Sequence, residues 1–600
     1  MPARLDAGSH RTDDRSPMKT AEPIEFRRSG REEKNVVPWS QRWYGRVALL
    51  LASVAMLTLA YAPIGQCYLA WVGLVPWLVV IARCRSYKSA IFLGWASGTA
   101  FFIANMWWMA YVTFPGMLGL MAILAAYWAV MAAVVRFSVG SPDGSASPRP
   151  KALPIFIIAF AWTALEFIRG NFIWRGLPWL YLGHTQTPLL PICQIADTLG
   201  VYGVSFWVAL INAIVAAWWL SGFRIAAVSR AVVIASLLTI GMLLYGVWRM
   251  RQTSLEPGPV VLVVQSNYPQ SNTGEKGATE DEILSFHYET TRDALLAHPE
   301  IDLVVWSETV MPALNQQTRL ALSGYEYGTK LKAIVQLLMK TSGTFSVGLI
   351  TGGHYDGLWD FKGEFPKPTD SRNSSYFFER SGLMSDLRYD KIHIVPFGEF
   401  MPFRDTWVYG VIKKFGPPDM DAYQLNGGDE DNLTVFPLRK TRDVMDLSTW
   451  RLVTPICFED IDSGLTARMF RPGPDGLKRA DVLVNLTNDG WFKANEMSQH
   501  LQVAAFRSIE NRVPTARSVN TGISGFVDSV GRTHDLIAAG TAGFSIAKLG
   551  IDPRVTFYTR YGDLFAWICV SVAGSAVLLK MLGAAKSRMT QQHTDPQERP

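Results

Sequence analysis

The sequence is poor in charged residues. Asp, Glu, Lys and Arg make up 18% of its 600 residues, against about a quarter in a soluble globular protein. The shortage is concentrated in residues 47–248 and again near 563–583, while the middle region and both ends have ordinary polarity. The net charge is only +6, and Lys and Arg form no dense basic stripe interleaved with aromatic residues. We therefore expect no nucleic-acid partner.

Cysteine is also scarce, and its placement excludes a disulfide framework. Only one of the five cysteines lies in the polar middle region; the five are Cys67, Cys84, Cys193, Cys457 and Cys569. His393 and His500 are available, but they have no H-E-x-x-H or similar metal-ligand spacing. No G-x-S-x-G motif is present. We expect no metal, no cofactor and no serine nucleophile.

Long apolar segments occupy the regions that lack charge. Most reach the roughly 17–25 residues that a helix needs to cross a bilayer. The first is not a cleaved signal peptide, because a long polar stretch precedes it and no small-residue cleavage pattern follows. Seven segments precede the polar region and an eighth follows it, at residues 47–63, 66–82, 89–110, 115–136, 152–168, 197–220, 229–248 and 563–583.

Loop charges predict the orientation of these segments, because Lys and Arg favour the cytoplasmic side. The N-terminal tail, the loops after segments two, four and six, and the C-terminal end all carry basic residues, whereas the loops after segments one and three carry none. Arg169 and Arg175, after segment five, mildly oppose this pattern. Both chain ends are predicted to be cytoplasmic, with the polar region outside the membrane.

This orientation divides the chain into five parts. We predict a disordered cytoplasmic tail at 1–45, a membrane domain with seven spans at 46–248 and an extracytoplasmic domain at 249–560. An eighth span at 561–584 and a second cytoplasmic tail at 585–600 complete the chain.

The outer domain alternates between strand-like and helix-like stretches. Residues 260–264, 302–306, 344–351, 375–379, 451–457 and 481–486 have strand character, and residues 279–298, 331–339 and 497–511 have helical spacing. Thr279 and Glu282 are spaced as a capping box. Such alternation predicts a layered α/β domain with buried sheets.

The loop between segments five and six reads EFIRGNFIWRGLPWLYLGHTQ, residues 166–186. Glu166 and Arg169 are three residues apart and could pair on one helix face. The aromatic residues, Trp179 among them, suit a membrane interface. The loop is either an aromatic belt or a surface for a lipid substrate, and its composition leaves both open.

Three polar side chains stand at the ends of predicted outer-domain strands or in a conspicuous loop. Glu308 follows the apolar strand LVVW, Lys391 lies in YDKIHIVPFGEF, and Cys457 closes RLVTPIC. Taken singly, each is an ordinary turn, surface or core residue. Together they supply a base, a cation and a thiol, which acyl transfer requires.

These segments resemble a known family. WSET with Glu308, the Lys391 segment and ICFED with Cys457 are similar to the Glu-Lys-Cys triad of the nitrilase superfamily. The closer resemblance is to bacterial apolipoprotein N-acyltransferases, and it extends to NLTNDGWF at 485–492 and to residues 499–528. It implies a multi-span α-helical membrane domain plus a nitrilase-like αββα sandwich.

The resemblance also implies a two-step reaction. A phospholipid, typically phosphatidylethanolamine, acylates Cys457, and the α-amino group of a diacylglyceryl apolipoprotein then takes the chain. Glu308 would be the general base. Lys391 would stabilise the oxyanion with the backbone N–H of Phe458, a position where Tyr is usual.

Glu399 and Glu459 match family positions that support the triad. We further expect Trp179, Asn488 and Trp491 to contact substrate. The implied location is the bacterial inner membrane, with the catalytic domain on the periplasmic side.

Two alternatives remain open. A membrane-tethered amidase would use the same triad with water as the acceptor, although it would not need eight spans. A non-catalytic transporter or lipoprotein-binding scaffold would carry an inactive nitrilase domain, against which the intact Glu308, Lys391 and Cys457 argue.

Overall fold

The computed structural model divides between residues 46 and 47, and apart from residues 43–46 the features described below lie after that division. The predicted tail at 1–45 falls almost wholly outside the described residues. The structure describes residues 42–139, 154–172, 176–252, 254–270, 277–363, 365–396, 398–400, 406–415, 424–443, 445–492 and 495–593.

Within the described residues, six helices are long and apolar enough to cross a membrane. They account for six of the eight predicted spans. Their outward side chains are apolar; on α10, for example, Leu237 and Leu244 are more than 60% exposed. The six are α1 Trp43–Ala60, α4 Tyr87–Met106 with its 3-10 extension to Tyr111, α5 Phe114–Val139, α9 Val201–Leu220, α10 Ser229–Met250 and α18 Leu564–His593.

The other two predicted spans form shorter helices. Residues 66–82 are divided into η2 Cys67–Leu69, α2 Ala70–Gly73 and α3 Val75–Ala82, with Pro76 in the first turn of α3. Because proline has no N–H and restricts the residue before it, the helix breaks here. The buried Asn212 side chain bonds the freed groups, accepting from Leu74 N at 2.8 Å and donating to Ala70 O at 2.7 Å.

Of the predicted span at 152–168, residues 155–168 lie in α6 Ile155–Asn171, which carries the buried Glu166 and Arg169. Two further boundaries differ from the prediction. The sixth span begins at Val201, because Gly200 has a φ of +66° that ends the preceding short helix. At the C-terminus, α18 continues to His593, beyond the predicted boundary at 584.

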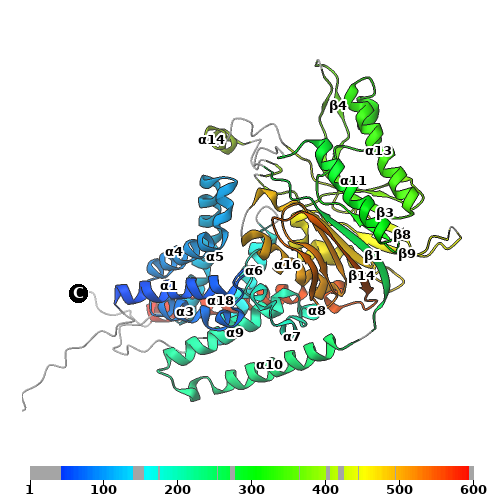
Figure 1. Cartoon of the computed structure of the whole chain (residues 1–600). Coiled ribbons are helices and arrows are strands. Elements are labelled where there is room, and N and C mark those ends of the chain that lie inside the picture. The colour runs from blue at the N-terminus through cyan, green and yellow to red at the C-terminus, as the bar shows by residue number, and fades with distance from the viewer. Residues whose placement is uncertain are drawn as a thin grey trace, which may run out of the picture. The chain divides into compact units, whose positions relative to one another are not determined.

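The domain between α10 and α18 is a sandwich of two six-stranded sheets (Figure 1). One has the order β14-β1-β2-β3-β6-β7 and the other β13-β12-β11-β10-β9-β8. The strands of the first sheet are β1 Glu256–Gln265, β2 Leu303–Val305, β3 Gly348–Asp356, β6 Ser371–Phe378, β7 Met384–Asp390 and β14 Gly543–Ile551. Those of the second are β8 Phe436–Arg439, β9 Thr449–Val453, β10 Val482–Thr487, β11 Thr515–Val519, β12 Ser524–Val527 and β13 Thr533–Ile537.

Strand alternation builds two apolar layers. Val261 and Val263 of β1 point into the core between the sheets, and Leu262 and Val264 point to the opposite face, as a period of two requires. Helices α11 Glu280–Ala297 and α13 Glu326–Phe345 cover that outer face, and α15 Ser463–Phe470 and α16 Asn495–Asn511 accompany the second sheet. The predicted αββα sandwich is confirmed, as is the Thr279–Glu282 capping box.

Some predicted elements were displaced. Residues 344–351 were predicted as a strand, but α13 runs to Phe345 and β3 starts at Gly348. The strand predicted to end at Cys457 ends at Val453, and Cys457 begins the 3-10 helix η7 Cys457–Ile461. A short β4–β5 ribbon, Trp359–Asp360 with Lys367–Pro368, was not predicted.

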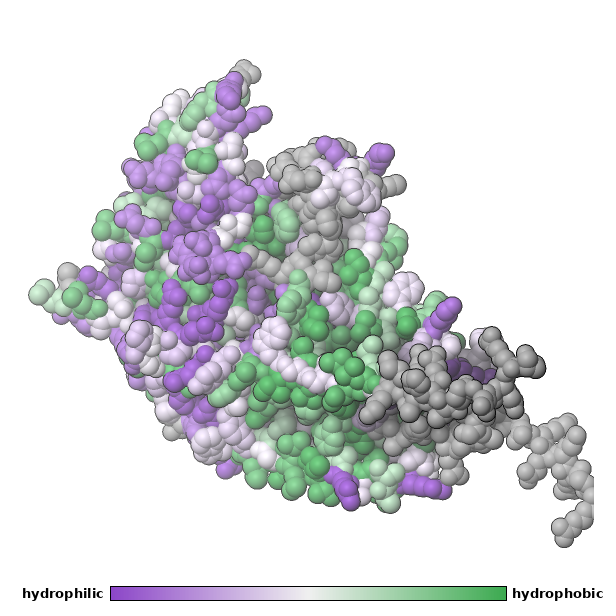
Figure 2. Space-filling model, turned by 180° about the vertical axis from the view of Figure 1, so that it is seen from behind, coloured by the Kyte–Doolittle hydropathy of each residue, from purple (hydrophilic) through white to green (hydrophobic). Residues whose placement is uncertain are grey.

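Helix α16 is part of the sandwich domain and also packs against the membrane helices. It lies between β10 and β11 in the chain, yet Val503, Phe506 and Ile509 lie in the same apolar core as the membrane helices. Figure 2 shows hydrophobic side chains gathered in one band of the visible face, with hydrophilic ones dominating the rest. The apolar helices and the sandwich domain therefore meet through the apolar face of α16.

A buried ion cluster also joins the sandwich domain to the membrane helices. Asp197, in the short helix α8 Ala196–Leu199, accepts hydrogen bonds from Arg512, which follows α16, at 2.8 Å and from Arg249 of α10 at 2.7 Å. The side chains of Asp197 and Arg512 have no exposed surface. A buried ion pair of this kind fixes the position of its elements more than it adds net stability.

Replacing Asp197 by Ala should lower the free energy of unfolding by about 3–5 kcal/mol, because Arg512 would remain buried without a carboxylate. The measurement is the thermal unfolding midpoint in detergent. Asp293→Ala on α11 is the control, since its pair with Arg292 is exposed on both sides and its loss should leave the midpoint unchanged. Equal midpoints for Asp197→Ala and the unsubstituted protein would contradict this interpretation.

Candidate active site

The three predicted catalytic side chains converge on one end of the sandwich. Glu308 follows β2, and Lys391 follows β7, both in the first sheet; Cys457 follows β9 in the second. The Lys391 ammonium lies 3.3 Å from Glu308 Oε1 and 2.9 Å from Glu399 Oε1. The Cys457 thiol lies close enough to Glu308 for each group to shift the pKa of the other. The structure thus brings together a thiol, a carboxylate and an ammonium group.

Glu308 is held by donors on both of its oxygens. Oε2 accepts from the backbone N–H of Asn488 at 2.8 Å, and Oε1 accepts from Asn373 Nδ2 at 2.7 Å. Asn373 also donates to Glu399 Oε1 at 3.2 Å. The sequence prediction missed Asn373, which lies in β6 with no motif around it.

Glu399 and Glu459 each accept hydrogen bonds that fix the segments around the site. Glu399 contacts Lys391 through one oxygen and accepts from Val395 N at 2.8 Å through the other. Glu459 accepts from the backbone N–H groups of Ile392 at 2.6 Å, His393 at 3.0 Å and Ile456 at 2.7 Å. A single carboxylate therefore ties the Lys391 loop to the residue that precedes Cys457.

Cys457 occupies a strained backbone position. Its φ is +50°, a left-handed conformation that non-glycine residues adopt rarely and that clusters at functional sites. The bonds of Glu459 on either side hold this turn in place. The turn leaves the thiol near enough to Glu308 for the carboxylate charge to raise the pKa of Cys457.

The comparisons with known proteins agree over nearly the whole chain. Residues 53–214 match the apolipoprotein N-acyltransferase N-terminal domain, and residues 263–548 match the carbon-nitrogen hydrolase family. Apolipoprotein N-acyltransferase from Geobacter metallireducens is 30% identical over 90% of this chain and 95% of its own length. Those from Chlorobaculum tepidum and Rhodopseudomonas palustris are 26% and 27% identical, over 87% and 91% of this chain and 92% and 96% of their own lengths.

The chain belongs to the apolipoprotein N-acyltransferase family. The resemblance seen in the sequence is confirmed, and with it the expectation of an enzyme that transfers an acyl chain. A carbon-nitrogen hydrolase domain alone would suit an amidase equally well, but the match to the N-terminal membrane domain favours the acyltransferase.

Burial and charge set the protonation behaviour of this acyltransferase site. Burial raises the pKa of Glu308, and the nearby Lys391 only partly offsets that rise. Burial opposes the charged form of Lys391, but Glu308, Glu399 and Cys457 outweigh it and hold its pKa well above the usual range. Burial and the Glu308 charge raise the pKa of Cys457 well above that of a free thiol. The resting thiol therefore keeps its proton, and a base must remove it.

The predicted substrate-contact residues lie beside this site. Trp179 stacks on Phe458 with ring centroids 6.0 Å apart and an interplanar angle of 4°. Asn488 binds Glu308 through its backbone, and its side chain accepts from Gly490 N at 3.1 Å. Trp491 is half-buried in the 3-10 helix η8 Asp489–Trp491 that follows.

A second buried polar cluster lies beneath the site. Asp489, Glu496 and His500 have ligand atoms within 4.8 Å of one another, close enough to hold a metal ion. However, His500 already bonds Asp460 at 2.7 Å and Asp489 at 3.1 Å, and Arg517 bonds Asp460 at 2.5 Å. His500 and Arg517 offset the charge of the carboxylates. The geometry therefore favours an internal ion-pair network over a metal site.

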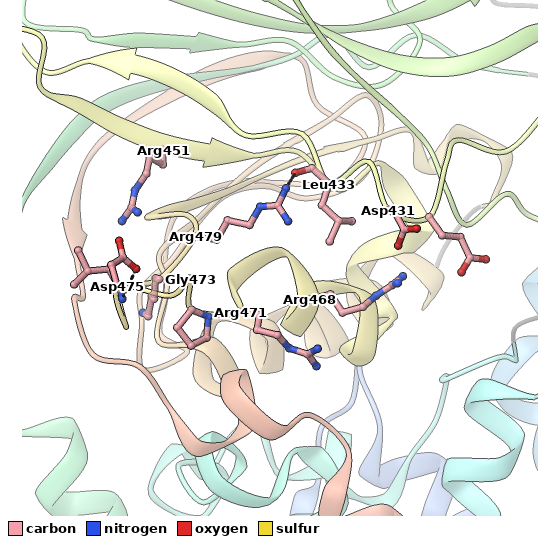
Figure 3. A pocket seen from close by; sticks show the side chains of 12 residues that line it. Asp431, Leu433, Arg451, Arg468, Arg471, Gly473, Asp475 and Arg479 are labelled. Atoms are coloured by element: carbon pink, nitrogen blue, oxygen red, sulfur yellow. Dashed lines mark hydrogen bonds between the residues drawn. The ribbon is translucent and has the colours of Figure 1, made fainter.

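A separate cavity of about 520 Å³ lies between the α15–β10 loop and the segment before β8 (Figure 3). Arg451, Arg468, Arg471 and Arg479 line it, together with Asp431 and Asp475. Arg451 pairs with Asp481, and Arg479 donates to Leu433 O at 2.6 Å. Because its lining includes no triad residue, this cavity is not the candidate active site.

Lys391→Met should slow the alkylation of Cys457. The Lys391 ammonium favours the thiolate, and the substitution removes it. Each unit of pKa increase removes about nine-tenths of the thiolate at a given pH, so we expect at least about a tenfold lower rate of iodoacetamide reaction at pH 8. The reaction is followed by mass spectrometry of the Cys457 peptide. Lys330→Met, which removes a partly exposed ion pair on α13, is the control; an unchanged rate in Lys391→Met would refute the electrostatic role.

Proposed function

We propose that this enzyme transfers an acyl chain from a phospholipid, through a thioester on Cys457, to the α-amino group of the N-terminal diacylglyceryl cysteine of apolipoproteins. The observation that supports it most is the buried contact of Lys391 with Glu308 and Glu399 beside the Cys457 thiol. Family membership supplies the substrate class.

In the first step, Glu308 takes the thiol proton and the sulfur attacks the sn-1 ester carbonyl of the phospholipid. Lys391 and the backbone N–H of Phe458 stabilise the tetrahedral oxyanion, as preorganised donors do in acyl transfer. The intermediate collapses, the C–O bond breaks, and Glu308 returns the proton to the departing lysophospholipid. A raised pKa suits Glu308 to both tasks.

In the second step, the uncharged α-amino group of the apolipoprotein attacks the thioester. Glu308 accepts a proton from the attacking nitrogen and passes it to the leaving thiolate, so that an amide forms and Cys457 is regenerated. Because the thioester keeps the acyl group activated, one difficult exchange becomes two easier ones.

Phosphatidylethanolamine is the proposed donor. Trp179, Asn488 and Trp491 are the proposed contacts for the substrates, and Glu399, Phe458 and Glu459 the proposed supports of the triad. This assignment rests on their positions around Glu308 and Cys457. The lipid can then enter from the bilayer, on the side of the catalytic domain that packs against the membrane helices.

The proposed location is the bacterial inner membrane, with both termini cytoplasmic and the catalytic domain periplasmic. The predicted boundaries support this: a membrane domain at 46–248, a catalytic domain at 249–560, an eighth span at 561–584, and cytoplasmic tails at 1–45 and 585–600. Basic residues at the predicted inner ends, such as Arg83 and Arg224, follow the usual charge bias.

Cys457 should carry a thioester-linked acyl chain when the enzyme meets phospholipid without an amine acceptor. Cys457→Ala should show no adduct and no N-acylation of a diacylglyceryl peptide. Intact-protein mass spectrometry before and after hydroxylamine treatment detects the adduct. Cys569→Ala, which alters a buried cysteine in α18, is the control.

Hydrolysis of small amides without any adduct on Cys457 would favour the amidase instead. Normal N-acylation by Cys457→Ala would favour the scaffold.

The orientation has its own test. A cysteine placed at exposed Ser381, in the turn before β7, should react with a membrane-impermeant maleimide in intact spheroplasts. A cysteine placed at Arg224, between α9 and α10, should react only after permeabilisation. Both positions are in described loops and exposed. The reverse pattern would invert the proposed topology.

A further inference from the structure

Gln499 is a buried amide on α16 that faces the membrane helices. Its exposed fraction is 2%. Its Oε1 accepts from the indole N–H of Trp179 at 2.8 Å and of Trp108 at 3.3 Å. Its Nε2 donates to Asn105 O at 3.1 Å and Ala62 O at 3.5 Å. One side chain thus uses its whole hydrogen-bonding capacity on three separate segments of the membrane domain.

The two indoles form part of an aromatic wall beside Cys457. Trp179 stacks on Phe458, the residue after the nucleophile, and Trp108 meets Trp179 at 5.8 Å and Phe492 at 4.9 Å between ring centroids. Two of the four rings come from the membrane domain and two from the catalytic domain. We name Trp108, Trp179, Phe458 and Phe492 the aromatic wall.

The backbone and the ring of Trp179 are held by different residues. Arg169 of α6 donates to Trp179 O at 2.6 Å, which fixes the loop. Trp108 N–H also reaches Asn105 O at 3.1 Å. Within the described residues, Gln499 Oε1 is the acceptor that the structure gives the Trp179 indole N–H. The ring orientation of Trp179 therefore depends on Gln499.

We propose that Gln499 is a positioning residue for the acyl-transfer reaction: it holds the buried Trp179 against Phe458, so that Phe458, a half-buried ring next to Cys457, keeps a fixed position beside the acyl donor. Gln499 touches neither the triad nor the reacting atoms. The inference rests on the proposed function, because it concerns the ring that lies beside the acyl donor.

The physical basis is the cost of an unpaired buried donor. Without Oε1, the Trp179 N–H would lose its partner in an apolar, fully buried place, and the ring would turn to find another. A turned ring would no longer stack on Phe458. The approach of a long-chain lipid should suffer, while a small water-soluble reagent should still reach the thiol.

The test compares Gln499→Leu with Gln502→Leu. Gln502 lies on the same helix and also bonds the membrane domain, through Ala62 N at 3.3 Å and Thr187 Oγ1 at 3.1 Å, but it does not contact the tryptophans. The probes are vesicles of phosphatidylethanolamine and phosphatidylglycerol, with acylation of Cys457 followed by mass spectrometry, and iodoacetamide as the small reagent.

We expect Cys457 to be acylated about tenfold more slowly in Gln499→Leu. This factor corresponds to the loss of the buried hydrogen bond of the Trp179 indole N–H. Iodoacetamide should react within about twofold of the normal rate, because the pKa of the thiol is set by other groups. Gln502→Leu should acylate normally. Normal acylation by Gln499→Leu, or an equal loss in both variants, would overturn the proposal.

A second variant covers the case in which Gln499→Leu fails to fold. Trp179→Phe keeps an aromatic ring but removes the N–H, and it should show the same selective loss with phospholipid. In the double variant the two losses of acylation rate should not add, because both substitutions remove the same hydrogen bond between Trp179 and Gln499. Additive losses would contradict the proposal. If the unsubstituted enzyme formed no thioester, the proposed function itself would fail, whatever the variants did.

Discussion

Lys391 is an ammonium group with 1% of its side chain exposed, and the site depends on how its charge is balanced. An isolated buried cation would lose its proton or unfold the chain. Glu308 and Glu399 prevent this, and each carboxylate is in turn bonded, by Asn373, by Asn488 N or by Val395 N. The proposed base, Glu308, and the proposed oxyanion stabiliser, Lys391, are therefore halves of one ion cluster, and neither charge is stable in this position without the other.

The sequence could indicate the three residues of the proposed triad because each stands beside a local sequence signal. Glu308 follows an apolar strand, and Cys457 is the one cysteine outside the apolar segments. Asn373 and Gln499 carry no such signal. Asn373 sits in a polar stretch of β6, and Gln499 in a helix whose spacing looks like that of any amphipathic helix. Their roles arise from residues more than fifty positions away, as between Asn373 and Glu308 or Gln499 and Trp108.

The same reasoning explains the differences in the fold. Residues 66–82 form a broken helix and not a continuous one, because hydropathy does not register that Asn212 can satisfy the backbone at a break near Pro76. Strands β7 and β13 are partly exposed and polar, MSDLRYD and THDLI, so no alternation reveals them. The sandwich was still predictable from its buried strands, which supply most of the apolar layers.

Helix α16 has a consequence for how the chain is made. Synthesis runs from the N-terminus, so the first seven apolar segments are complete before residues 495–511 leave the ribosome. Val503, Phe506 and Ile509 then find their partners on helices already in place. The membrane domain thus serves as a template on which the catalytic domain finishes folding. A catalytic domain cut free at residue 249 would carry a hydrophobic stripe with nothing to cover it, and such a fragment would tend to aggregate.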